Sequence, residues 1–526
     1  MKKQTGAPLS ERLRHFLPAV MLLAAVAAVY WPCLGAGLLN WDDDAYILRN
    51  YLLHDFSPRG IAELFSRFYA LNYQPVTLLS YMLEHWLVGH EPFLYHAVNV
   101  ALHAANTLLV LALGKKLLDD GRAAFLCALL FAVHPMHVES VAWISERKDV
   151  LYAFFYLAGL LAYLKASERN RFPVMALVFF TLSLLSKSMA ISFPLSIAVL
   201  DWLKGTKIWK ADKLPFFVIA GIFAWVTMRS QNRADTLSLS HIWTGIQLAG
   251  HNALFYPAKL LWPTNLSAFY PLPKYLTPYH FLAPFGAAAA YGAAWYLLGK
   301  HRLGKAGIML FLVMIAPVLQ LVTIGRTIAA DRYVYLPMLG LALPFAALIT
   351  SAYDRLSAKH GKAMLAAAMA IALLALGIQA RARCLVWRDS VSLWSDVLAS
   401  QPDNVIALTN RGLALKKEGK LAAALSDFNK AIEADPRSSM LYANRSAVLA
   451  LSGNLSAARA DAEEAVRLAP DGIAARMNRG VILFMYGEAK KAAKDFAYVL
   501  EKDPGNTEAK RNLEQAARLT AEKAEK

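Results

Sequence analysis

Long apolar runs fill roughly the first 380 residues of the chain. Stretches of about 17 to 22 hydrophobic residues recur there, and each can cross the ~30 Å hydrocarbon core of a bilayer as a helix. Charged, Ala-rich sequence follows. The pattern predicts an all-α protein, with a polytopic membrane helix bundle over residues 1–380 and a second domain over residues 381–526. The predicted membrane spans, about eleven in number, are 17–38, 92–113, 122–135, 149–165, 172–186, 189–203, 214–229, 280–298, 306–323, 333–351 and 363–380.

Basic residues in the short connections predict how the bundle is oriented. Loops such as 115–122, 165–171 and 300–305 are rich in Lys and Arg, which favours the cytoplasmic side. If the N-terminus also lies there, about eleven spans alternate correctly and the C-terminal domain lies on the opposite, outer face. This requires the apolar segment 242–261 to be an interfacial or re-entrant helix in a long outer loop; a full crossing is the competing interpretation. Cytoplasmic loops explain most of the net charge of +17, so nucleic acid is not an expected partner.

The C-terminal domain follows a period of 34 residues, which is the tetratricopeptide period. The period is seen in three series: Pro402, Pro436, Pro470 and Pro504; Gly419, Gly453 and Gly487; and Asn410, Asn444 and Asn478. We count three full repeats, each a pair of helices that buries its apolar face against its neighbours. They cover residues 405–438, 439–472 and 473–506, and a polar capping helix over 507–522 follows.

The repeated amides suggest a role in binding. An Asn side chain can donate to and accept from a peptide bond, so Asn410, Asn444 and Asn478 are candidate residues for holding an extended acceptor peptide. The alternative is that Asn is simply common at this helix position. The arginine that follows each of these amides is interpreted as a solvated face residue.

Three carboxylates come directly after the first predicted span, in Asn40-Trp41-Asp42-Asp43-Asp44. Charged groups crowded against a bilayer are costly and usually functional. Neighbouring carboxylates also repel, which raises the pKa of at least one of them. A general base at the membrane surface requires this property.

Further polar residues fall on the same predicted face. Arginine recognises phosphate through two parallel hydrogen bonds, and Arg326 and Arg332 open the tenth span together with Asp331. All three are candidate residues for binding the donor's phosphate or sugar. An interfacial anchor or a salt bridge to Asp331 is the alternative for these arginines. Arg147 lies in another outer connection and is a further candidate for binding the donor phosphate, as is Arg229. Acids and arginines converging on one membrane face suit a reaction on a phosphate-bearing lipid.

The segment His134-x-x-His137-x-Glu139 has the residue types of a metal site. Pro135 interrupts the helix that would place both histidines on one face. We therefore expect no metal here and no required cofactor, and we interpret His137 and Glu139 as ligands of a sugar or a phosphate. The three cysteines, Cys33, Cys127 and Cys384, imply no disulfide framework.

One predicted span carries polar residues on a single face. His96, Asn99, His103 and Asn106 recur at helical spacing, and polar groups at membrane depth must find partners. They either line a cavity near a substrate or form hydrogen bonds between helices. We favour the second interpretation.

These motifs together carry a family resemblance over nearly the whole chain. The chain resembles the transmembrane-and-tetratricopeptide (TMTC-like) proteins, within the GT-C fold glycosyltransferases that include protein O-mannosyltransferases. The segments that carry the resemblance are Asn40-Trp41-Asp42-Asp43, Tyr73-Gln74-Pro75-Val76-Thr77, His96-Ala97-Val98-Asn99, His134-Pro135-Met136-His137-Val138-Glu139, Arg147-Lys148-Asp149, Asn265-Leu266-Ser267 and Ala330-Asp331-Arg332-Tyr333.

The resemblance implies an enzyme that transfers a sugar from a polyprenyl- or dolichyl-phosphate donor to Ser or Thr hydroxyls of exported proteins on the non-cytoplasmic face. Mannose is the usual sugar among eukaryotic relatives. The first outer-loop acid is the catalytic base in such enzymes, which implies Asp42 or Asp43 here; the adjacent Asp44 leaves the choice open. We expect a bacterial inner-membrane protein that meets a lipid-linked donor and an acceptor peptide. A transferase acting on a glycolipid or envelope polysaccharide, and a non-catalytic scaffold, stay open.

Overall fold

The computed structural model describes residues 9–231, 239–273, 275–322, 325 and 327–525. Two compact units emerge, Met1–Asp389 and Ser390–Lys526, called here the membrane unit and the repeat unit. The sequence pattern places the domain boundary near residue 381. The last residues before Ser390 pack with the first unit because Trp387 is buried against Trp143, with the rings stacked 5.5 Å apart.

The membrane unit is almost entirely helical, as predicted. Its helices are α1 (Leu9–Tyr30), α2 (Pro58–Ser66), α3 (Pro75–Val88), α4 (Pro92–Leu117), α5 (Gly121–Val133), α6 (Val138–Ala142), α7 (Arg147–Glu168), α8 (Val174–Ser186), α9 (Phe193–Lys204), α10 (Leu214–Ser230), α11 (Leu239–Leu261), α12 (Pro278–Leu297), α13 (Arg302–Ile315), α14 (Met338–Arg355) and α15 (Lys359–Val386). Proline in the first turn begins α3, α4 and α9, where its missing N–H costs nothing.

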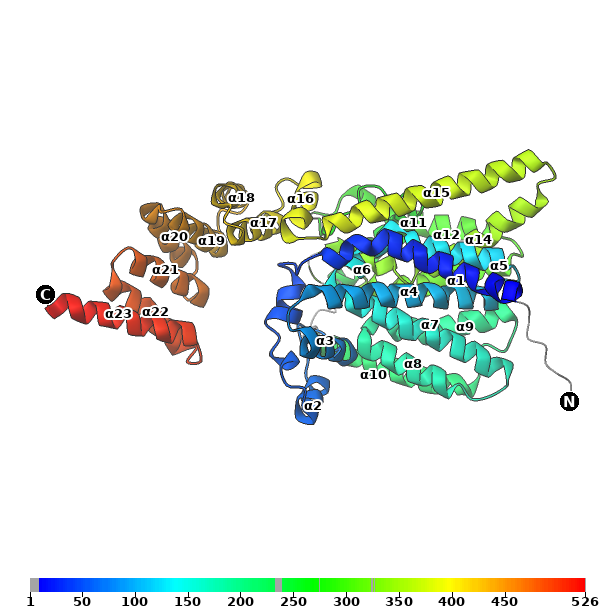
Figure 1. The fold of residues 1–526 in the computed structure, drawn as a ribbon, viewed down its shortest axis with the longest axis horizontal. Coiled ribbons are helices and arrows are strands. Elements are labelled where there is room, and N and C mark those ends of the chain that lie inside the picture. The colour runs from blue at the N-terminus through cyan, green and yellow to red at the C-terminus, as the bar shows by residue number, and fades with distance from the viewer. Residues whose placement is uncertain (1–8, 232–238, 274, 323–324, 326, 526) are drawn as a thin grey trace. The chain divides into compact units, whose positions relative to one another are not determined.

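Neighbouring helices of the bundle pack side by side. Figure 1 shows α1, α4, α7 and α8 in succession, and each contacts the next. Helix α5 lies against α1, α4 and α14, and α15 covers α1 and α5. The core is therefore built from helices far apart in the sequence.

Within the described residues, five segments are long and apolar enough to cross a membrane, which makes the chain a membrane protein. They are Phe16–Gly35, Pro92–Leu117, Ile144–Glu168, Ala211–Ser230 and Lys359–Val386. A sixth crossing is possible if Gly121–Val133 and Pro135–Ala142, bent by 54°, form one span.

The count of eleven spans stays a prediction. A helix overlies each predicted range, but α8, α9 and α13 have only 12 to 14 residues, and a helix of that length extends about 20 Å. The segment 242–261 is helical as α11, which the structure places against α12.

Short turns connect the helices at the end of the bundle where α1 finishes. They include η1 (Trp31–Gly35), η2 (Asp44–Leu48), η3 (Tyr51–Leu53), η4 (Pro135–His137), η5 (Ile144–Glu146), η6 (Ser188–Ser192), η8 (Ala316–Val318), which packs against η6, and η9 (Asp331–Val334); η7 (Ala211–Lys213) precedes α10. Strands β1 (Tyr270–Pro271) and β2 (Thr327–Ala329) pair antiparallel and join the 262–271 loop to the segment before η9.

The repeat unit begins with α16 (Ser390–Ser400). Three helix pairs follow: α17 (Val405–Lys417) with α18 (Leu421–Ala434), α19 (Ser439–Leu451) with α20 (Leu455–Leu468), and α21 (Ile473–Met485) with α22 (Ala489–Lys502); α23 (Thr507–Glu525) comes last. The periodic glycines have φ of +75°, +81° and +91° at the turn within each pair, a conformation that glycine adopts without strain.

Candidate functional site

The segment after α1 is held by a buried carboxylate. Asp43 is fully buried; its Oδ2 accepts a hydrogen bond from the Leu39 N–H at 2.9 Å. Its Oδ1 accepts one from the Ser145 N–H at 3.0 Å and another from the Ser145 hydroxyl. Burial raises the pKa of Asp43 to about 6, against the opposing effect of these hydrogen bonds. Asp43 therefore connects the acidic segment to η5.

Asp42 has a different environment. It is partly exposed, and its carboxylate accepts no hydrogen bond from the described part of the chain. Burial raises its pKa, and the nearby Lys148 and Arg332 partly offset that effect while Glu146 adds to it. An ionised carboxylate with open acceptor positions and a raised pKa can take a proton.

The third acid is more peripheral. Asp44 lies 3.8 Å from Arg49, and 36% of its side chain is exposed. A surface pair of this kind contributes little to stability. Of the three acids, Asp42 has the carboxylate best placed for chemistry.

A cluster of opposite charges adjoins Asp42. Glu146 is buried and lies 3.1 Å from Lys148, 3.6 Å from Lys187 and 3.2 Å from Arg332. Glu139 accepts a hydrogen bond from the Arg332 backbone N–H at 3.0 Å and pairs with its guanidinium. Only 12–14% of each of the three cationic side chains is exposed. These five residues, called here the charge cluster, hold three cations at the edge of the Asp42 site.

Stacked tryptophans support the charge cluster. Trp41, next to Asp42, stacks on the buried Trp143 with ring centroids 4.5 Å apart. The Arg332 guanidinium also contacts Trp143. Its central carbon lies 5.6 Å from the centroid of the Trp143 ring, which is a cation–π distance. The stack therefore fixes the relative positions of the acid and the arginine.

Arg147 has a structural role, which differs from its expected role at the donor phosphate. Its guanidinium donates to both oxygens of Glu84, at 2.7 and 3.2 Å, to the Tyr95 carbonyl at 2.8 Å, to Ser80 and to Asn99. The side chain is fully buried. All five of its donors are used, so none remains for a phosphate.

His137 also faces the interior of the bundle. Its Nδ1 donates to the Phe131 carbonyl at 2.8 Å, and its ring packs against Phe131 and Tyr335. The side chain is fully buried. The expected contact of His137 with a sugar therefore has no support in its position.

Asp331 forms a hydrogen bond to the long loop that follows α11. The Tyr270 hydroxyl donates to its Oδ1 at 2.8 Å, beside the β1–β2 pair. Burial raises the pKa of Asp331 to about 7, and Glu139 adds to the shift. Arg326 lies outside the described residues.

Three residues on the polar face of α4, Asn99, His103 and Asn106, form hydrogen bonds to other segments of the bundle, which was the interpretation favoured from the sequence. Asn99 donates to the Trp143 carbonyl at 3.1 Å, and Asn106 donates to the Val150 carbonyl at 2.8 Å. His103 lies 2.8 Å from the Tyr335 hydroxyl and 3.2 Å from the Ala132 carbonyl.

The described residues contain no group of three or more His, Cys, Asp or Glu placed to hold a metal ion.

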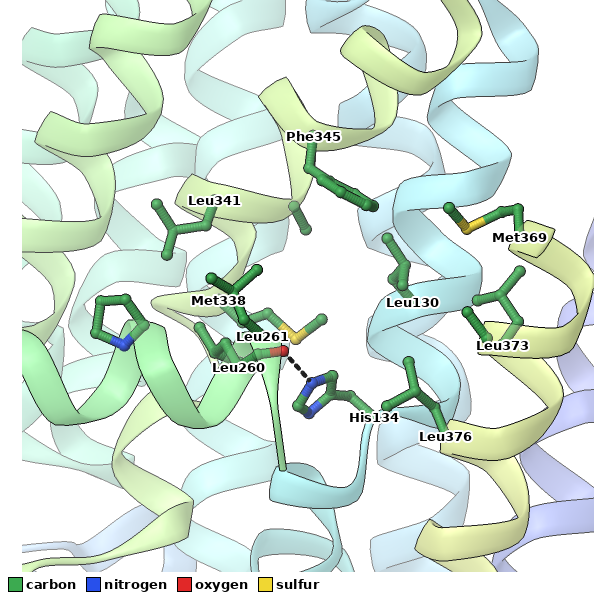
Figure 2. A pocket seen from close by; sticks show the side chains of 13 residues that line it. Leu130, His134, Leu260, Leu261, Met338, Leu341, Phe345, Met369, Leu373 and Leu376 are labelled. Carbon is green, nitrogen blue, oxygen red and sulfur yellow. Dashed lines mark hydrogen bonds between the residues drawn. The ribbon is translucent and has the colours of Figure 1, made fainter. Parts of the chain in front are cut away.

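An apolar cavity of about 450 Å³ opens among α5, α11, α14 and α15 (Figure 2). His134 is its polar boundary; its Nε2 donates to the Leu260 carbonyl at 3.0 Å. The remaining lining is Leu130, Pro257, Leu260, Leu261, Met338, Leu341, Ala342, Phe345, Met369, Ala372, Leu373 and Leu376. His134 lies five residues before Glu139 of the charge cluster in the sequence.

Sequence reasoning missed Lys187 and the roles of Ser145 and Glu146. Lys187 lies in the short connection between α8 and η6 and pairs with Asp149. The predicted alternation of spans places this connection, between 172–186 and 189–203, on the outer face. The sequence signal that could have identified Lys187 is a lysine in this predicted outer connection.

The repeat unit uses its periodic polar residues for packing. The Asn478 amide accepts a hydrogen bond from Ser446 at 2.6 Å and donates to the Ala443 carbonyl at 3.1 Å, so it connects adjacent repeats. Asn410 and Asn444 were expected to share its peptide-binding role, and that role stays a prediction for them.

The periodic arginines are paired with carboxylates and only 23–25% exposed, which differs from their interpretation as solvated face residues. Each forms a two-pronged pair with an aspartate sixteen residues later, such as Arg445 with Asp461 at 2.7 and 2.8 Å. The same pair forms at Arg411–Asp427 and Arg479–Asp495. They join the two helices of each repeat.

Comparisons with known proteins agree with this organisation. Two tetratricopeptide-repeat family models match residues 405–438 and 452–507. Human protein O-mannosyl-transferase TMTC4 is 26% identical over 80% of this chain and 68% of its own length. Mouse protein O-mannosyl-transferase TMTC3 is 33% identical over 29% of this chain, and the match spans only 17% of that protein. The first TPR domain of human RPAP3 is 29% identical, covering 24% of this chain and 98% of that chain, with a TM-score of 0.23.

The chain is an all-α membrane protein that ends in tetratricopeptide repeats. More particularly, it is TMTC-like, and the resemblance drawn from its motifs is confirmed.

Proposed function

We propose that this protein is a membrane glycosyltransferase that moves a sugar, mannose in the first instance, from a polyprenyl-phosphate donor to Ser or Thr hydroxyls of exported proteins. The observation that carries the proposal is the Asp42 carboxylate, which is partly open and adjoins Lys148 and Arg332. Relatives named protein O-mannosyl-transferases support the choice of reaction.

Asp42 acts as the general base in this proposal. The acceptor hydroxyl gives its proton to the Asp42 carboxylate while its oxygen forms a bond to C1 of the sugar. The bond from C1 to the phosphate oxygen breaks, and its electron pair stays on the lipid phosphate. One displacement of this kind inverts the configuration at C1.

The cations of the charge cluster stabilise the leaving phosphate. Arg332 and Lys148 both act electrostatically on Asp42, so they would offer positive charge to a phosphate bound beside the acid. Glu139 and Glu146 hold the Arg332 guanidinium in position. Asp43, through Ser145, keeps the acidic segment against η5. Arg326 remains a predicted phosphate ligand.

The apolar cavity beside His134 would take the start of the donor's hydrocarbon chain. Its walls are almost entirely aliphatic, and burying a chain there removes apolar surface from water. In this proposal the donor's phosphate lies at the charge cluster, and His134 of the cavity supports that arrangement because it is five residues before Glu139 in the sequence. The repeat unit would bind the acceptor protein on the non-cytoplasmic side, as tetratricopeptide arrays present extended binding surfaces.

The experiment uses membranes that contain the protein, a panel of radiolabelled polyprenyl-phosphate sugars that includes mannose, and Ser/Thr-rich peptides. We expect label on the peptide, lost when Asp42 is replaced by Asn. Label on lipid but none on peptide would instead favour a glycolipid acceptor. No transfer from any donor to either acceptor would contradict an enzymatic role.

A further inference from the structure

Two cysteines that are distant in sequence lie together at the junction between the first and last helices of the membrane unit. Cys33 lies in η1, directly after α1, and Cys384 lies in the last turn of α15. The Cys384 thiol is within hydrogen-bonding reach of the Cys33 side chain. The third cysteine of the chain, Cys127, lies in α5 and is buried on its own.

The backbone around the two thiols is fixed by several contacts. The Cys384 thiol donates to the Val29 carbonyl at 3.7 Å, and the Arg381 guanidinium donates to the Ala28 carbonyl. The Gly37 N–H donates to the Arg388 carbonyl at 2.8 Å. Cys33 and Cys384 are 0% and 1% exposed. The elements that carry the two cysteines, η1 and α15, pack against each other, so a bond between them would join segments that are already in contact.

We propose that Cys33 and Cys384 form a disulfide that joins the outer end of α1 to the end of α15, just before the repeat unit. The proposal rests on the predicted orientation, in which these ends face the non-cytoplasmic side, and not on the transferase reaction. Disulfides persist in such oxidising compartments. Because the bond would close a very long loop, it would restrict the unfolded chain strongly.

The bond forms by thiol–disulfide exchange with a disulfide-bearing oxidant, such as an oxidoreductase of the exporting compartment. One thiolate of the pair attacks the oxidant's disulfide and releases one oxidant thiol. The second thiolate then attacks the mixed disulfide, which releases the other oxidant thiol and leaves the bond between Cys33 and Cys384. Because both thiols are buried in the folded protein, exchange takes place before α15 packs against α1.

The test is thiol counting on the full-length protein. Cells are quenched in acid, and the protein is denatured with N-ethylmaleimide, reduced, and labelled with a second maleimide of different mass. Mass spectrometry should find the first label on Cys127 and the second on Cys33 and Cys384. The first label on Cys33 and Cys384 would overturn the proposal, as would a disulfide between two copies of the chain.

Three variants make the result specific. Cys127→Ser should leave the pair unchanged. Cys33→Ser should expose Cys384 to the first label, and Cys384→Ser should do the same for Cys33. Because the wild type and Cys127→Ser alone decide the outcome, poor folding of the other variants would not rescue a failed proposal. Transferase activity plays no part in the readout, so failure here and failure of the proposed function are distinguishable.

Discussion

Replacing Asp42 by Asn should abolish most transfer and leave folding intact. The Asp42 side chain is partly exposed and accepts no hydrogen bond from the described residues, so the amide displaces no internal contact. A positioned general base contributes about 100- to 10,000-fold to a rate. We expect kcat to fall by that factor, which corresponds to roughly 3–5 kcal/mol of activation free energy, with the thermal midpoint unchanged.

The same substitution at Asp43 should act mainly on folding stability. In Asp43→Asn, one side-chain oxygen can still accept from Ser145, but the amide NH2 must face a second donor, either Ser145 or the Leu39 N–H. A lost hydrogen bond that leaves a buried donor unpaired costs about 1–3 kcal/mol. We expect a lower thermal midpoint and a correspondingly smaller folded fraction.

The assay compares labelled-sugar transfer per folded molecule with thermal unfolding for both variants and the wild type. Asp42→Asn should fall in the first measurement only, and Asp43→Asn chiefly in the second. A fully active Asp42→Asn protein would refute the assignment of the base. So would an Asp43→Asn protein that folds normally but has lost transfer.

Three further predictions concern the charge cluster, the cavity and the repeats, and a fourth concerns pH. Arg332→Lys keeps the charge but not the contacts to two carboxylates, so kcat should drop about 100-fold; unchanged kinetics would remove Arg332 from the site. Ala372→Trp should fill part of the cavity and raise KM for the lipid donor, while Ile371→Trp on the exposed face of α15 should not; equal effects would count against a lipid site. Arg445→Ala leaves a largely buried aspartate unpaired and should destabilise the repeat unit by about 1–3 kcal/mol in denaturant unfolding; no change would make the pair dispensable. Because burial raises the pKa of Asp42 and a base must be ionised, activity should fall on acidification with a midpoint above 3.8; a flat profile would contradict this.

The repeat unit and the helices could be predicted because their signals are local. The 34-residue period places every turn, and its glycines have the positive φ that the turns need. The same period occurs in Asp427, Asp461 and Asp495, so the pairing of each periodic arginine was visible in the sequence as a second series sixteen residues later. Apolar runs identify helices equally well, although their lengths do not decide which of them cross the bilayer.

The division of roles at the site could not be predicted, because it depends on contacts distant in the chain. Asp42 and Asp43 have the same chemistry and differ only in what surrounds them; Ser145, which binds Asp43, is 102 residues away. Arg147 and Arg332 likewise look equivalent in the sequence. Glu84, 63 residues before Arg147, accepts a hydrogen bond from the Arg147 guanidinium, which gives Arg147 a structural role.

The most direct test of the central claim is the mass of a peptide with a single serine after incubation with the purified protein in lipid vesicles and a mannosyl polyprenyl-phosphate donor. The account predicts a gain of one hexose on the serine with the wild type, and none with Asp42→Asn or with an alanine-substituted peptide. An unmodified peptide in every reaction, or a gain that does not depend on Asp42, would contradict it.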